Sequence, residues 1–97
     1  MNERRDRPIV LSRHANDRLA QRGATAEEVT TTVREGEWQP AKRGKQHAVK
    51  RYEFGGTSPV NGLVYRYKTV DAVFADEPQR IFVLTVKVYY STEEAAG

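Results

Sequence analysis

The chain has 97 residues, a length that accommodates one domain with a single modest hydrophobic core. Its hydrophobic content of 38% and charged content of 30% are typical of a globular protein and exclude a disordered one. The formal net charge is only +3, and the lack of cysteine excludes disulfides, thiolate metal sites and a cysteine nucleophile.

The distribution of apolar residues predicts the cellular location of the protein and the limits of its domain. No apolar stretch approaches the roughly 18 residues that span a bilayer, so we expect a cytoplasmic protein without a membrane association. Residues 1–8 predict a flexible N-terminus, 9–90 a single α+β domain, and 91–97 a flexible acidic tail.

A short helix is predicted by a start signal and a stop signal near the N-terminus. Ser12 is a favourable N-cap, because its hydroxyl accepts a hydrogen bond from the first turn. Gly23 stands where a left-handed residue ends many helices. Between them, Ala15 and Leu19 form an apolar stripe that packs the helix onto the rest of the domain.

One edge of this helix carries charged side chains. His14 and Arg18 are four residues apart and lie on one face, with Arg22 one turn further along. An imidazole beside one or two guanidinium groups is suited to holding a phosphate. The alternative is a solvated helix face, which is the more common role of such residues.

A second helix is predicted by a capping box, in which Thr25 and Glu28 satisfy each other's backbone amides. Val29 and Val33 give this helix one narrow apolar stripe, and Gly36 ends it. Two short helices, each apolar along one side, must cover another element of the fold.

The next segment is basic and lacks an apolar period. Trp38 and Pro40 are expected to end the helical region, and residues 41–49 predict a loop that leads into a strand. Residues 42–51 carry five lysines and arginines and no acidic residue, which suits a nucleic acid or an acidic protein partner. We expect His47, within this segment, to be solvated.

From residue 49 onward the apolar residues alternate, which predicts strands at 49–54, 63–68, 69–75 and 81–90. In the last strand one face is wholly apolar, formed by Phe82, Leu84, Val86, Val88 and Tyr90. The other face becomes polar at Thr85, Lys87 and Tyr89. The order of elements predicts an α+β fold with two N-terminal helices packed on one face of a three- to four-stranded antiparallel sheet.

Four segments of the sequence carry a resemblance to a known family. They read Ser12-x-His14-Ala15-x-x-Arg18-x-x-x-Arg22-Gly23-Ala24-Thr25-x-Glu27-Glu28-Val29, Gly36-Glu37-Trp38, Tyr67-Lys68-Thr69-Val70 and Val83-Leu84-Thr85-Val86. Over about residues 11–90 the chain resembles the small bacterial proteins grouped as domain of unknown function 4258. That family is allied to RelE-like toxins, which are small metal-independent RNases of toxin–antitoxin pairs or of larger secreted toxins. The resemblance therefore implies a RelE-like fold, an endoribonuclease of the mRNA interferase type, RNA as substrate, and a cognate antitoxin or immunity protein as partner.

RNA is cleaved without a metal when its own 2′-hydroxyl attacks the adjacent phosphorus, which leaves a 2′,3′-cyclic phosphate. This reaction needs a base, an acid and cations around the phosphorane, and no cofactor. The catalytic candidates are His14, Arg18, Thr85 and Tyr89. The candidates for binding the RNA backbone or bases are Arg22, Lys50, Arg51, Lys68 and Lys87, with Tyr65 or Tyr67 as a stacking platform. We expect His14 and Arg18 to converge with the polar end of the last strand into one anion-binding hollow.

Other interpretations of these residues remain open. The tyrosines are commonly half-buried strand residues, Lys50, Arg51 and Lys68 also suit a solvated sheet edge, and His14 suits a structural hydrogen bond. The alternative functions are a non-catalytic module that binds nucleic acid or an antitoxin, and a protein that pairs with itself or a partner through its sheet edge. RNA cleavage in EDTA that is lost in His14→Ala would distinguish the enzyme from both. The sequence leaves the oligomeric state open.

Overall fold

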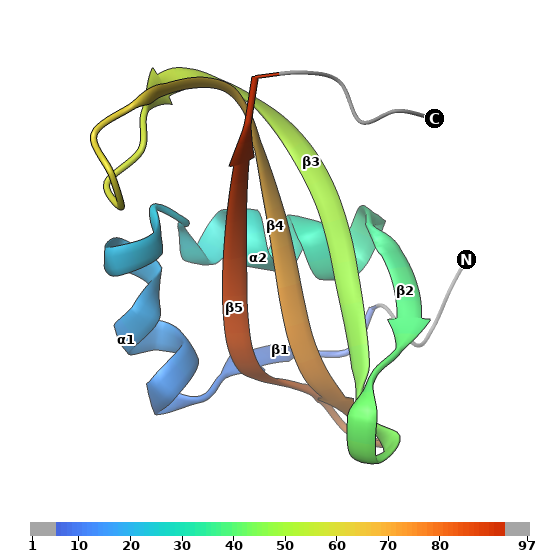
Figure 1. Ribbon diagram of the computed structural model, residues 1–97. Coiled ribbons are helices and arrows are strands. Elements are labelled where there is room, and N and C mark those ends of the chain that lie inside the picture. The colour runs from blue at the N-terminus through green and yellow to red at the C-terminus, as the bar shows by residue number, and fades with distance from the viewer. Residues whose placement is uncertain (1–5, 93–97) are drawn as a thin grey trace.

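Five strands form one curved sheet, and two helices lie against one of its faces (Figure 1). The structure is a computed structural model that describes residues 6–92. In chain order its elements are β1 (Ile9–Leu11), α1 (Arg13–Arg22), α2 (Ala26–Glu35), β2 (Glu37–Pro40), the 3-10 turn η1 (Lys42–Gly44), β3 (Gln46–Thr57), β4 (Val64–Asp76) and β5 (Ile81–Ser91). The predicted α+β class, with both helices on one face of the sheet, is confirmed.

Both helices begin and end where the sequence predicts. The Ser12 hydroxyl accepts a hydrogen bond from the Ala15 amide at 3.0 Å, and Gly23 ends α1 with a left-handed φ of 78°. The capping box of α2 is complete, with the Thr25 and Glu28 side chains each accepting from the other's amide at 3.0 Å. Within residues 6–92 no helix is long and apolar enough to cross a membrane.

The sheet has the order β1-β5-β4-β3-β2, in which β1 runs parallel to β5 and every other pairing is antiparallel. The prediction of three to four antiparallel strands is therefore wrong in number, and it is wrong in direction for β1 alone. The predicted strands at 63–68 and 69–75 form one continuous strand, β4. The additional strands, β1 and β2, have three and four residues, too few to show a period. Each of these two strands forms because it pairs with a segment elsewhere in the chain. In β1, for example, Ile9 pairs with Ile81 of β5.

A β-bulge changes which residues of β5 face the helices. Thr85 pairs with Val73, but Val83 pairs with the next residue of β4, Phe74, so that Leu84 has no counterpart on β4. The alternation along β5 shifts by one residue at this point, and the predicted apolar face is wrong before the bulge. The side of β5 that faces the helices carries Ile81, Val83, Val86, Val88 and Tyr90.

The hydrophobic core lies between the helices and the sheet. Both helices contribute their apolar stripes, and the fully buried side chains opposite them come from β3, β4 and β5. Trp38 of β2 closes one side of this core by packing edge-on against Phe74, with ring centroids 4.7 Å apart. The opposite face of the sheet carries no helix within the described residues (Figure 1), and we call it the open face.

The first described residues contact the turn between β4 and β5. The Arg7 guanidinium donates to the Asp76 carboxylate and to the Glu77 carbonyl, and the Pro8 carbonyl accepts from the Ile81 amide at 2.8 Å. Among the described residues, Arg7 and Pro8 therefore contact the domain although they precede the predicted boundary at residue 9. Residues 1–5 and 93–97, which belong to the predicted flexible termini, lie outside the described part of the chain.

Candidate functional site

Rows of side chains cross the open face on β3, β4 and β5, and three of these rows carry the candidate site residues. In the order of these strands, the register gives the rows His47–Val73–Thr85, Val49–Asp71–Lys87 and Arg51–Thr69–Tyr89. Side chains within a row, and on the diagonals between adjacent rows, are close enough to interact. The open face is therefore polar along its length, whereas the helix-covered face is apolar.

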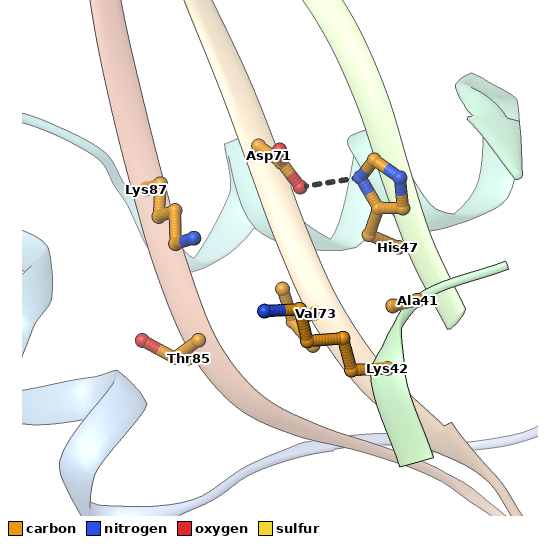
Figure 2. Close-up of a pocket in the computed structure, with 7 residues that line it drawn as sticks. All are labelled: Ala41, Lys42, His47, Asp71, Val73, Thr85 and Lys87. Carbon is orange, nitrogen blue, oxygen red and sulfur yellow. Dashed lines mark hydrogen bonds and ion pairs between the residues drawn. The ribbon is translucent and has the colours of Figure 1, made fainter. Parts of the chain in front are cut away.

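A hollow of about 420 Å³ lies over the first two rows (Figure 2). It is lined by Ala41, Lys42, His47, Asp71, Val73, Thr85 and Lys87. Figure 2 shows Lys42 reaching over β4 from the turn between β2 and β3, while Lys87 and Thr85 come from β5 on the other side. The lining brings together two ammonium groups, an imidazole, a hydroxyl and one carboxylate.

The imidazole and the carboxylate form a pair. His47 Nδ1 lies 3.0 Å from Asp71 Oδ1, along the diagonal between the first two rows, and both side chains are mostly buried. Because an ionised carboxylate can only accept a hydrogen bond, Nδ1 carries the hydrogen that is donated to Asp71, and Nε2 is the ring nitrogen left to exchange a proton. Nε2 lies on the side of the ring away from Asp71 (Figure 2). Asp71 thus fixes both the orientation and the tautomer of His47.

The two lysines give the hollow a positive charge. Within residues 6–92 neither the Lys42 nor the Lys87 ammonium makes a hydrogen bond or an ion pair, whereas the Asp71 carboxylate is engaged by His47. Two ammonium groups that share a concave surface without an acidic partner attract an anion. The size and charge of the hollow suit a phosphate group with part of the sugar that carries it.

The turn that carries Lys42 is held in an uncommon backbone conformation. Arg43 has a φ of 59° and Gly44 one of 73°, and the Ala41 amide donates to the Lys45 carbonyl at 2.9 Å across the turn. A non-glycine residue in the left-handed region costs on the order of 1 kcal/mol, so the surrounding contacts must maintain this turn. The turn places Lys42 over the open face instead of beside it.

The third row continues the polar surface beyond the hollow. Tyr89 is 55% exposed on β5, and Arg51 lies across Thr69 from it. The Arg51 guanidinium stacks 4.5 Å from the centroid of the buried Tyr67 ring. A chain that enters the hollow would therefore next meet an exposed aromatic ring and a guanidinium.

The site residues predicted from the sequence divide into those on this face and those elsewhere. Thr85 and Lys87 line the hollow, and Tyr89 and Arg51 lie in the adjacent row. These four side chains are brought to one surface, although Tyr89 and Arg51 do not line the hollow itself.

The predicted residues of α1 are not part of the hollow. His14 is exposed and makes no hydrogen bond or ion pair with the described residues. Arg18 donates to the Gln21 side chain at 3.2 Å, and Arg22 donates to the Val86 carbonyl at the edge of β5. The expected convergence of His14 and Arg18 with Thr85 is not seen, because α1 packs on the helix-covered side while Thr85 faces the open side.

Two predicted RNA-binding lysines lie on the helix-covered side. Lys68 is almost completely buried, and its ammonium lies 2.8 Å from both the Gly23 carbonyl and the Glu28 carboxylate. Lys50 lies 3.8 Å from the Glu35 carboxylate. Lys68 therefore ties β4 to the helices and is not accessible to a substrate.

The predicted stacking tyrosines are also occupied within the domain. Tyr67 is buried beneath Arg51, and Tyr65 packs 5.5 Å from the centroid of the Tyr90 ring and accepts a hydrogen bond from Asn61. Neither ring presents a free face comparable with that of Tyr89.

Sequence reasoning does not identify Lys42, His47 and Asp71 as site residues. Residues 41–49 show no apolar period and therefore predict a loop around His47, whereas β3 already begins at Gln46. The usable signal is Asp71, a carboxylate in the middle of a long apolar strand, where it needs a partner. Ala48 is buried on the helix-covered face, and neighbouring residues of a strand point to opposite faces. His47 therefore points to the open face, as Asp71 does.

Comparison with known proteins adds no assignment. The sequence matches no protein-family model and no curated protein, and no solved structure matches the fold. Within residues 6–92 no group of three or more His, Cys, Asp or Glu side chains is placed to hold a metal ion.

Proposed function

We propose that this protein is a metal-independent ribonuclease of the toxin type, acting on cytoplasmic RNA that it binds on the open face of its sheet. The observation that carries the proposal is the His47–Asp71 pair, which lies beside two ammonium groups without acidic partners among residues 6–92. The resemblance to the family called domain of unknown function 4258 implies the same activity and a RelE-like classification of the fold, although the segments that carry it contain none of Lys42, His47 and Asp71. A cognate antitoxin or immunity protein belongs to this proposal as a partner.

In this mechanism the His47 Nε2 removes the proton of a ribose 2′-hydroxyl. The 2′-oxygen forms a bond to the adjacent phosphorus, the bond from phosphorus to the 5′-oxygen breaks, and a 2′,3′-cyclic phosphate remains. An ammonium of the hollow gives its proton to the departing 5′-oxygen, and exchange with water restores both groups. Asp71 stabilises the imidazolium that forms, and Lys42 and Lys87 stabilise the charge on the phosphorane.

The third row supplies a contact for the neighbouring nucleotide. The exposed ring of Tyr89 offers a face on which a base can stack. Thr85, beside Lys87 in the hollow, has a hydroxyl that can donate to a phosphate oxygen. Recognition of this kind requires unpaired bases, which makes single-stranded RNA the substrate.

The test compares the two histidines of the chain. Purified wild type, His47→Ala and His14→Ala are incubated in EDTA with an end-labelled single-stranded RNA, and the cyclic phosphate is identified by mass spectrometry. Loss of the base should lower kcat/KM about 10²- to 10⁴-fold in His47→Ala. Retained cleavage in His47→Ala with loss in His14→Ala would refute the hollow and restore the site predicted on α1.

A matched lysine pair tests the charge of the hollow. Lys42→Met should raise the RNA concentration needed for half-maximal cleavage, because it removes an ammonium that faces the phosphate. Lys45→Met, three residues along the same turn and outside the lining of the hollow, carries the same charge change and serves as the control. Equal effects of the two substitutions would show that only the overall charge matters.

The second candidate is a module that binds RNA on the same face without cleaving it. The two ammonium groups, which have no acidic partner in the described part of the chain, also favour this function. It predicts no cyclic phosphate and an RNA affinity that survives His47→Ala. Replacing both Lys42 and Lys87 should then reduce the slope of log K against log salt by about 0.7 for each phosphate that is no longer neutralised.

A further inference from the structure

We propose that two copies of this chain pair antiparallel along the outer edge of β3, with Arg51 of each copy opposite Glu53 of the other. On its outer side β3 is paired with β2, but that pairing covers only Gln46 to Val49. From Lys50 onward this side of β3 has no neighbouring strand in the described structure (Figure 1). An unpaired edge of this kind is a template for another strand. The inference does not depend on the ribonuclease proposal.

The backbone of β3 directs its free hydrogen-bonding groups outward at the required residues. A Cβ on Gly36, which directly precedes β2, would lie 2.6 Å from the Val49 carbonyl oxygen, so this carbonyl faces the outer side. Backbone groups alternate in direction along a strand, and the amides and carbonyls of Arg51 and Glu53 therefore face the same side. The register of β3 with β4 is regular up to Glu53, which keeps this alternation intact.

The side chains along this edge are self-complementary. An antiparallel pair of copies centred on Tyr52 sets Arg51 opposite Glu53 twice, by symmetry, and sets Lys50 opposite Phe54 twice. The pairing ends there, because the next residue, Gly55, would lie opposite Val49 of the other copy, whose outer side β2 already occupies. Arg51 and Glu53 both point to the open face, where they form two cross-strand ion pairs. Lys50 and Phe54 meet on the other face as an ammonium and an aromatic ring.

The charges on this edge favour a second copy over another partner. Within residues 6–92 both side chains are exposed, Glu53 makes no ion pair, and Arg51 contacts only the Tyr67 ring. A uniformly acidic strand would be repelled by Glu53, and a uniformly basic strand would be repelled by Arg51. A strand with one acidic and one basic residue in the same order as β3 forms an attractive pair with each of them. The resulting dimer has one continuous sheet of ten strands, five from each copy, with both hollows on the same face.

The test is a charge exchange followed by sedimentation velocity. The wild type should form a species of twice 11.0 kDa. Arg51→Glu and Glu53→Arg should each weaken association at least about tenfold, because each turns two attractive pairs into two repulsive ones. An equal mixture of the two variants should restore the dimer, since the acidic edge of one then faces the basic edge of the other. Arg13→Glu makes the same charge change on the exposed surface of α1 and should leave association unchanged.

Either of two association results would overturn the proposal. One is a wild type that stays monomeric up to about 500 μM, a concentration at which even a weak specific dimer forms. The other is a mixture of the two charge variants that does not associate although circular dichroism shows both to be folded. Hydrogen exchange of the wild type is an independent test. The backbone amides of Arg51 and Glu53 must exchange more slowly as the protein concentration rises. Unchanged exchange at these amides would also contradict the dimer.

Discussion

Replacing the buried Lys68 by methionine should destabilise the domain strongly. The Lys68 side chain is 7% exposed, and its ammonium lies 2.8 Å from the Gly23 carbonyl and 2.8 Å from the Glu28 carboxylate. Methionine keeps the apolar stem and removes only the charged group. The carbonyl then loses its donor, and the Glu28 carboxylate keeps the Thr25 amide but loses its cation.

The magnitude follows from the two interactions that are removed. Hydrogen bonds to charged groups contribute about 1.5–3 kcal/mol each, and Glu28 is 24% exposed and partly hydrated, which favours the lower end. We expect the free energy of unfolding to fall by about 3 kcal/mol, out of a total of roughly 5–15 kcal/mol for a domain of this size. A loss of this size lowers the melting temperature by about 12–24 °C.

Urea unfolding followed by circular dichroism, with the slope m compared between variants, measures this loss. Lys50→Met is the matched control, because the Lys50 ammonium is 3.8 Å from an exposed carboxylate and contributes at most about 0.5 kcal/mol. A Lys68→Met variant whose free energy of unfolding is within about 0.5 kcal/mol of the wild-type value would refute the conclusion that Lys68 stabilises the packing of the helices on β4. It would also return this residue to the set of candidate RNA-binding lysines.

Two further substitutions probe the junction between α1 and β5. Gly23→Ala should cost at least about 1–2 kcal/mol in urea unfolding, because φ is 78° and the added Cβ would collide with the Tyr90 hydroxyl. Tyr90→Phe should cost about 1 kcal/mol near neutral pH, since it removes the 2.7 Å hydrogen bond to the Arg22 carbonyl. Burial raises the pKa of the Tyr90 phenol, so its stabilising contribution is complete below the ordinary tyrosine pKa and is lost as the pH rises through the folded value. The alkaline decline in stability should therefore be shallower in Tyr90→Phe, and an identical decline would contradict this linkage.

Sequence reasoning is sufficient where the signals are local. Each of the caps at Ser12, Gly23 and Thr25 bonds to a residue within one helical turn of it. Both helices can therefore be located from the sequence without knowledge of the rest of the fold. The long strands also show their period-two patterns, because one face is buried by the helices.

The prediction fails where a residue depends on a partner distant in sequence. β1 and β2 are strands only because β5 and β3 lie beside them. The bulge at Leu84 depends on the register with β4, which no pattern within β5 reveals. An undetected bulge reverses the face of every residue on one side of it, and this is why the alternation wrongly places Phe82 on the helix-covered face.

The candidate site is predicted in part for the same reason. Thr85 and Lys87 are found because they follow the bulge, where the alternation is read correctly. The pairing of His47 with Asp71 is missed because it joins strands at residues that are 24 positions apart. His14 is favoured because its spacing from Arg18 is visible in the sequence, but spacing on a helix does not reveal which side of a sheet the helix faces.

The position of β5 between β1 and β4 has a consequence for how the domain is made. β1 is the first of the five strands to be synthesised, and its partner β5 is the last. A nascent chain that lacks β5 cannot pair β1, lacks the strand with which α1 makes most of its contacts, and leaves one edge of β4 open. The complete sheet therefore forms only after β5 has left the ribosome, and a product truncated before β5 lacks Thr85 and Lys87 of the hollow.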